Sequence, residues 1–118
     1  MTNDKLTLNL LQGAVSFNFS PESAREVQQE IAALMQKLKA NATLKMPGGG
    51  SRPQPQPPME YRYTGEVLLE IFCNPNIYPS PFAAKVLVTL RDERIRLTAE
   101  AELTRLVEDL NEYLDRVA

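Results

Sequence analysis

The feature that most constrains the fold is a pattern that occurs twice in this 118-residue chain, an alternating apolar segment followed by a stretch of helical periodicity. Residues 5–19 alternate apolar and polar side chains with a turn at Gly13, which predicts a β-hairpin. Residues 85–97 repeat this alternation around a tight turn at Asp92. Apolar residues at spacings of three and four follow each hairpin and indicate an amphipathic helix. The sequence therefore predicts two hairpin-helix (ββα) units.

The two units match almost in register. The segment KLTLNL that begins at Lys5 aligns with KVLVTL at Lys85, 80 residues later, and the apolar stripes of the two helices follow at nearly the same offset. A fixed offset of this kind indicates an internal repeat. Because few residues are identical, the pattern fits either a true duplication or two copies of one stable supersecondary arrangement.

Capping residues indicate where each helix begins. Ser20 suits an N-cap and Pro21 suits the first helical position, so the first helix should start there and run to about residue 41. Thr98 is the expected N-cap of the second helix, with Glu100 in its first turn.

The segment between the units contains one long alternating run at residues 60–73, with Gly65 in its middle. A run of this length predicts one long strand, and a mid-strand glycine predicts a bulge or a bend. We therefore expect a bent strand that joins the sheet formed by the two hairpins.

A flexible linker is expected at residues 47–58, which hold five of the nine prolines and three of the five glycines. Arg52, Pro55 and Pro58 have the spacing of a ligand for SH3-type grooves. Proline-rich linkers produce such matches readily, so a tolerated surface loop is the favoured interpretation.

Together these elements predict a single α+β domain over residues 1–118. The first ββα unit occupies 5–42, and the long strand plus the second unit occupy 60–118. An antiparallel sheet of about five strands with both helices on one face would bury every apolar stripe. The chain is 43% hydrophobic, which suffices for one core at this length.

The second face of this sheet should be open to solvent and yet partly apolar, and the loop from Asn74 to Phe82 is also unusually apolar. Mixed faces of this kind commonly bind a second copy or a partner, so we predict a homodimer. For the loop, the favoured interpretation is that its aromatic side chains cover one end of the core, and a contact role is the alternative. The candidate protein-binding residues are Leu68, Phe72, Leu87, Ile77, Tyr78 and Phe82.

Residues that commonly perform catalysis are scarce. The chain has no His, and the single Cys73 lies among core-facing positions, where its thiol should be inert. Residues 48–50 are three glycines that lack the Lys-Ser/Thr of a phosphate-binding loop. We therefore expect neither a catalytic residue, nor a metal site, nor a cofactor.

Carboxylates cluster at two places, and both are interpreted as structural. Glu66 and Glu70 are expected to pair with arginines across the sheet, namely Arg94 and Arg96. The acidic residues at 108–112 are expected to form a solvated helix face.

The charge pattern disfavours nucleic acid and membrane as partners. The net charge is −2, and residues 99–118 hold six acidic and two basic side chains. Arg62, Arg94 and Arg96 are nevertheless an alternative ligand-binding or nucleic-acid-binding patch. The neighbouring Tyr61 and Tyr63 share the parity of the core residues, so they should be buried rather than free to stack on bases.

The N-terminal residues lack the basic start and unbroken apolar stretch of a signal peptide, and the longest apolar run, Ile31–Met35, is far too short to span a membrane. A soluble, cytoplasmic protein is therefore predicted. The leading functional hypothesis is a non-catalytic adaptor, assembly factor or chaperone-like module that binds another protein. The alternative is a ligand-binding or nucleic-acid-binding module that uses the arginine patch.

Overall fold

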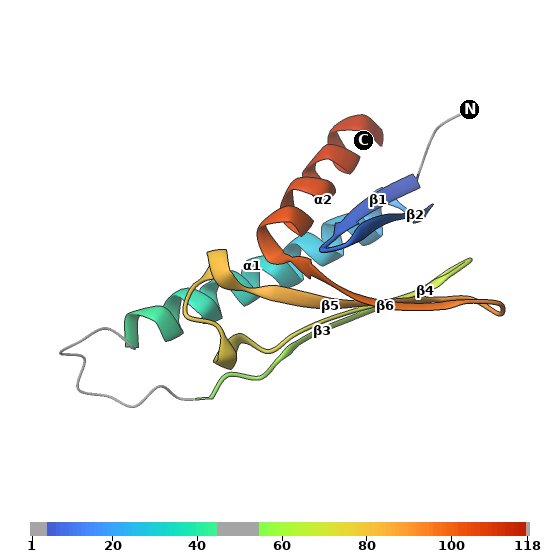
Figure 1. The fold of residues 1–118 in the computed structure, drawn as a ribbon. Helices are drawn as coiled ribbons and strands as arrows, with labels where there is room; N and C mark the ends of the chain where they lie inside the picture. Colours follow the sequence, from blue (N-terminus) through green and yellow to red (C-terminus); the bar gives the residue numbers. More distant parts are fainter. Residues whose placement is uncertain (1–4, 45–54, 118) are drawn as a thin grey trace.

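The structure is a computed structural model that describes residues 5–44 and 55–117. In these ranges the fold is α+β, with two helices and two antiparallel sheets (Figure 1). The smaller sheet pairs β1 (Lys5–Leu10) with β2 (Gly13–Asn18). The larger sheet has the order β3 (Met59–Thr64), β4 (Leu68–Cys73), β5 (Lys85–Arg91) and β6 (Arg96–Glu102). The helices are α1 (Pro21–Leu44) and α2 (Leu103–Val117), and two short 3-10 helices, η1 (Pro75–Ile77) and η2 (Pro81–Ala83), connect β4 to β5.

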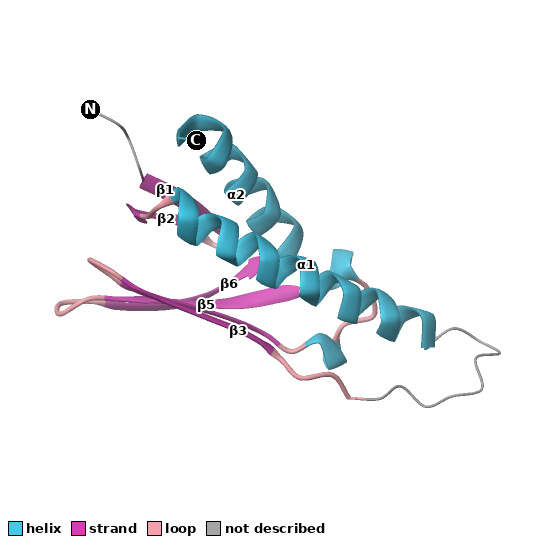
Figure 2. Ribbon diagram, turned by 180° about the vertical axis from the view of Figure 1, so that it is seen from behind, coloured by secondary structure: helices cyan, strands magenta, loops and turns pink. Residues whose placement is uncertain are grey.

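Both helices and the β1–β2 hairpin lie on one side of the four-stranded sheet (Figures 1 and 2). The core forms between these layers, because α1 and the sheet both present an apolar face toward it. The buried residues of α1 recur at helical spacing: Ala24, Val27, Ile31, Leu34 and Leu38. The buried residues of the central strands alternate: Leu69, Ile71, Cys73, Val86, Val88 and Leu90. Across the described ranges, neither helix combines the length and the apolar character that a membrane crossing requires.

The first hairpin and the start of α1 confirm the sequence prediction. The turn between β1 and β2 ends at Gly13, whose φ of +142° is a conformation that favours glycine. Ser20 acts as the N-cap, since its Oγ accepts a hydrogen bond from the Ser23 N–H at 3.1 Å. The helix then begins at Pro21 and continues to Leu44, slightly beyond the predicted end.

The prediction of one long strand at residues 60–73 is wrong. The segment is a hairpin of β3 and β4, in which Arg62 lies opposite Glu70 and Thr64 opposite Leu68. Gly65 belongs to the turn, and its N–H donates to the carbonyl of Val67 at 3.0 Å. The Tyr63 ring packs over Gly65 so closely that a β-carbon at this position would collide with it. A chain reversal, rather than a bend, explains the glycine.

The prediction of a single five-stranded sheet is also wrong. The β1–β2 hairpin forms a separate sheet, and a backbone hydrogen bond of 2.9 Å from the Leu11 N–H to the carbonyl of Glu100 links it to the larger one. The two hairpin-helix segments occur in the predicted chain order. However, β5 and β6 belong to the larger sheet, so the segments are not equivalent parts of one sheet.

The second helix begins later than predicted. Thr98, the expected N-cap, lies in β6 opposite Thr89, and the pairing continues to Glu102 opposite Lys85. The helix starts directly afterwards at Leu103, whose N–H donates to the carbonyl of Ala84 at 3.0 Å. The turn before β6 also differs from expectation, because the alternation of residues 85–97 places Ile95 with the core-facing residues, whereas its side chain is 63% exposed.

Part of the predicted linker falls outside the described residues, including Arg52, so the SH3-type spacing is not described by the structure. At its C-terminal end the chain is fixed by two hydrogen bonds of 2.8 Å. The Gln56 N–H donates to Oδ1 of Asn76, and Nδ2 of Asn76 donates to the carbonyl of Gln56. These bonds attach the segment that precedes β3 to η1.

Candidate functional site

The candidate site is the face of the four-stranded sheet that points away from the helices, which we call the open face (Figures 1 and 2). No element of the described ranges covers it. Because side chains alternate along a strand, the register places its members in three cross-strand rows. The rows are Glu60–Phe72–Leu87–Glu100, Arg62–Glu70–Thr89–Thr98 and Thr64–Leu68–Arg91–Arg96.

The centre of the first row is apolar. Phe72 lies directly opposite Leu87, and each side chain is 40% exposed. Ile77 and Tyr78 of the loop after β4 join them, because all four residues line one shallow hollow of about 180 Å³. Four of the six predicted protein-binding residues are therefore gathered at one place.

The other two predicted residues lie apart from this hollow. Leu68 is on the open face in the third row, half-buried and opposite Arg91. Phe82 belongs to η2 and is 84% exposed. Its ring therefore does not cover the end of the core, whereas Tyr78, the other aromatic residue of the loop, is half-buried and packs against the core as the favoured interpretation expected.

The three predicted arginines do not form one patch. Arg62 lies on β3, one of the two edge strands of the sheet, whereas β6 is the other edge strand. The Arg62 side chain forms an ion pair with Glu70 at 3.4 Å. Arg96 on β6 lies opposite Arg91 on β5, and Arg94 is in the turn between them. Within the described part of the chain, the side chains of Arg91, Arg94 and Arg96 have no hydrogen-bond or ion-pair partner. Like charges placed directly opposite on a sheet are destabilising, so this end of the face favours a negatively charged neighbour.

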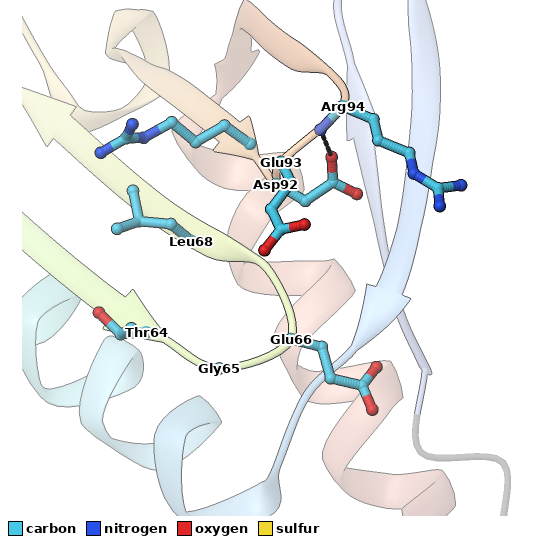
Figure 3. Close-up of a pocket in the computed structure, with 8 residues that line it drawn as sticks. Thr64, Gly65, Glu66, Leu68, Asp92, Glu93 and Arg94 are labelled. Carbon is cyan, nitrogen blue, oxygen red and sulfur yellow. Dashed lines mark hydrogen bonds between the residues drawn. The ribbon is translucent and has the colours of Figure 1, made fainter.

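A second hollow, of about 640 Å³, lies at this arginine-rich end (Figure 3). Its lining includes Arg91 and Arg94 but also the carboxylates of Glu66, Asp92 and Glu93. Oδ1 of Asp92 accepts hydrogen bonds from the backbone N–H groups of Arg94 and Ile95, which lowers the pKa of this carboxyl below its usual value. In Figure 3 the side chain of Arg94 extends away from Leu68. The hollow is therefore of mixed charge and is not a preformed anion site.

The carboxylates have different partners from those predicted. Glu70 pairs with Arg62, and Glu66 accepts a hydrogen bond of 2.7 Å from Nδ2 of Asn18. The larger discrepancy is Asp109, predicted to be solvated but only 7% exposed. Its two carboxylate oxygens accept from the backbone N–H and from Nδ2 of Asn9, both at 2.8 Å. Asp109 therefore holds β1 against α2.

The tyrosines near the arginines are half-buried on the opposite side of the sheet, as the parity indicated. The Tyr63 ring packs edge-on against Phe19, with 4.7 Å between ring centroids. The Tyr61 hydroxyl donates to Oε1 of Glu26 at 3.3 Å, and burial raises its pKa to about 12. Neither ring stands on the open face, where it could stack on a base.

The Cys73 thiol is buried, and this burial raises its pKa to about 11 from 9.0. At pH 8 we expect Ellman's reagent to react at least about 100-fold more slowly with the native protein than with the urea-unfolded chain, because the thiolate is the reacting form. Stability that comes from the neutral thiol is complete below about pH 9 and is lost as the pH rises through 11. Equal reaction rates in both states would contradict the buried placement.

Among residues 5–44 and 55–117, no group of three or more His, Cys, Asp or Glu side chains is arranged to hold a metal ion. Comparison of the chain with protein-family models, with curated protein sequences and with solved structures finds no match. The fold and the site define an α+β protein whose larger sheet has one covered face and one open, partly apolar face. Function must therefore be inferred from the chemistry of that face.

Proposed function

We propose that this chain is a non-catalytic protein-binding module and that the open face is its binding surface. The proposal rests on one observation, the cross-strand pair of Phe72 and Leu87, each 40% exposed on the two central strands of an uncovered sheet face. Burial of apolar surface stabilises a complex by roughly 25 cal/mol per Å², so large side chains left in water favour a partner.

The surroundings of this pair support a protein partner over a small molecule. Glu60 and Glu100 flank Phe72 and Leu87 in the same row. An apolar centre with a polar rim is the usual anatomy of a protein interface. The hollow at this centre, about 180 Å³, is below the size of a typical small-molecule pocket.

The rigidity of the surface is the second support. Phe72 and Leu87 lie on β4 and β5, the two central strands, which are hydrogen-bonded on both sides. Side chains held by such strands lose little freedom when a partner binds. An adaptor, assembly factor or chaperone-like module acting in the cytoplasm would use a surface of this kind, and a single buried thiol suits a reducing compartment.

A second candidate function is the binding of an anionic ligand or of nucleic acid at Arg91, Arg94 and Arg96. The observation in its favour is the like-charge pair of Arg91 and Arg96. Three carboxylates in the same hollow weaken this candidate. Salt-dependent retention on heparin that is lost in Arg96→Glu would favour it over the first.

Site-specific photo-crosslinking tests the proposed function in its host cell. A benzophenone amino acid replaces Leu87 on the open face or, as a matched control, the exposed Arg25 on the solvent side of α1. We expect a light-dependent adduct of defined mass with the probe at position 87 and none with the probe at position 25. Adding Phe72→Asp should abolish the adduct, since it places a charge at the apolar centre. Equal adduct yields at the two positions would contradict the proposal.

A further inference from the structure

On the basis of this proposed function, we infer that the occupant of the open face is a second copy of the chain. The two copies pack face to face and are related by a two-fold axis. This axis lies in the plane between the two sheets and runs parallel to the cross-strand rows, at right angles to the strands. The inference depends on the distribution of charge over the three rows, which makes the face complementary to itself.

The charge changes sign along the strands. The first row has a glutamate at each end, Glu60 and Glu100, and Glu102 lies further along β6 beside Lys85. The third row contains Arg91 and Arg96 and no carboxylate. The turn beyond it contains Arg94 and also the carboxylates of Asp92 and Glu93, so the basic character belongs to the third row itself. Among the cross-strand rows of the open face, the first is thus acidic and the third is basic.

A half-turn about the proposed axis places the acidic row of one copy over the basic row of the other. Glu100 then faces Arg96 of the partner subunit, and Phe72 faces Leu68 of the partner subunit. The middle row lies on the axis and faces itself, with Arg62 already paired to Glu70 in its own chain. An isologous interface of this type requires a self-complementary face of this kind.

Arg96 and Glu100 are not able to satisfy each other within one chain. They are four residues apart on the same strand, which separates them by roughly 13 Å. Two sheets that stack face to face lie about 10 Å apart, a distance that an arginine and a glutamate can bridge between them. Each dimer therefore gains two such pairs, related by the axis.

The size of the face sets the expected strength of association. Four strands of seven residues or fewer give a surface of roughly 19 by 23 Å. This is at the small end of specific interfaces, so we expect a dimer that dissociates in the micromolar range. Sedimentation velocity over a concentration series is the suitable measurement.

The test uses two charge reversals and their mixture. Arg96→Glu places a second glutamate against Glu100 of the partner subunit, and Glu100→Arg places arginine against arginine, so each variant alone should dimerise at least tenfold more weakly than the wild type. An equimolar mixture should form a heterodimer, because both contacts between positions 96 and 100 across the axis again join a glutamate to an arginine. The double variant Arg96→Glu/Glu100→Arg should restore the homodimer. Arg25→Glu, an exposed charge reversal on α1 and therefore on the other side of the sheet, is the matched control and should leave association unchanged.

The outcomes separate this inference from the proposed function. A wild-type chain that stays monomeric at about 100 μM would overturn the second copy as occupant, while the crosslinking test would still decide whether another protein binds the open face. A wild-type dimer whose single variants are not rescued by mixing would overturn the antiparallel arrangement. If circular dichroism shows that a reversal unfolds the chain, the neutral variants Arg96→Gln and Glu100→Gln replace it. Each of these should weaken the dimer, and unchanged association in both would overturn the inference.

Discussion

Replacing Asp109 with alanine should lower the free energy of unfolding by about 3 kcal/mol. The carboxylate accepts two hydrogen bonds of 2.8 Å from Asn9, one from the backbone N–H and one from Nδ2. Hydrogen bonds to a charged group contribute about 1.5–3 kcal/mol each, and truncation leaves two donors of β1 without their acceptor. Part of this loss is recovered because Asn9 is only half-buried and water can reach it.

Urea denaturation followed by circular dichroism measures this effect, with Glu108→Ala as the control. Glu108 is the exposed neighbour of Asp109 and pairs with Arg105 at 3.4 Å, so its removal should cost less than about 0.5 kcal/mol. Asp109→Asn should give an intermediate loss of stability. The amide oxygen can still accept one of the two hydrogen bonds from Asn9, but the amide NH₂ group then faces the other Asn9 donor. Similar values for Asp109→Ala and Glu108→Ala would show that the contact with Asn9 does not stabilise the fold.

The parity of the alternating residues explains which hairpins the sequence reveals. In the β1–β2 hairpin, even-numbered Leu8 pairs with odd-numbered Val15. The core-facing residues therefore change from even to odd numbers across the turn, and this change reveals the chain reversal in the sequence. The same switch occurs between β5 and β6, where Val88 pairs with Ala99. In the β3–β4 hairpin, Tyr63 pairs with Leu69 and both are odd-numbered. Because three residues separate these two strands, the core-facing residues keep odd numbers on both sides of the turn. The sequence of a hairpin with such a turn therefore shows the same alternation as one long strand.

The start of α2 differs from the prediction because long-range strand pairing outweighs local helix propensity. Alanine and glutamate favour helices, and residues 98–102 are rich in both. In the structure Ala99 and Ala101 instead continue the inward alternation of β6, opposite Val88 and Val86. Tertiary pairing of this kind is not visible in a single sequence.

The sequence indicates the exposed apolar residues of the open face and two of its arginines, but not how its charged residues are arranged. Phe72 and Leu87 follow from parity alone, since each breaks the polar pattern of its strand. The opposition of Arg91 and Arg96 depends on the register of β5 against β6, which only the structure fixes. The burial of Asp109 does have a signal in the sequence. Asp109 lies three residues after Leu106 and four before Tyr113, on the edge of the buried stripe of α2.

Replacing Tyr113 with alanine should destabilise the protein by about 4 kcal/mol, the largest effect we expect from a single side chain. Tyr113 on α2 is fully buried, and its ring centroid lies 6.2 Å from that of Phe19, the residue between β2 and α1. Phe19 in turn packs against Tyr63 of β3 at 4.7 Å. These three rings connect the second helix, the first hairpin and the edge of the larger sheet.

Loss of the Tyr113 ring opens a cavity where these layers meet, and the surrounding strands relax only partly to fill it. Thermal and urea unfolding of Tyr113→Ala measure the cost, and Asp115→Ala, an exposed position two residues along the same helix, should change stability by less than about 0.5 kcal/mol. Tyr113→Leu should lie between the two, since it keeps apolar volume but not the edge-on ring contact. A loss below about 1.5 kcal/mol for Tyr113→Ala would mean that the ring does not join the two sheets. The β1–β2 hairpin would then be held against α2 by Asp109, and against the larger sheet by the Leu11–Glu100 and Asn18–Glu66 hydrogen bonds.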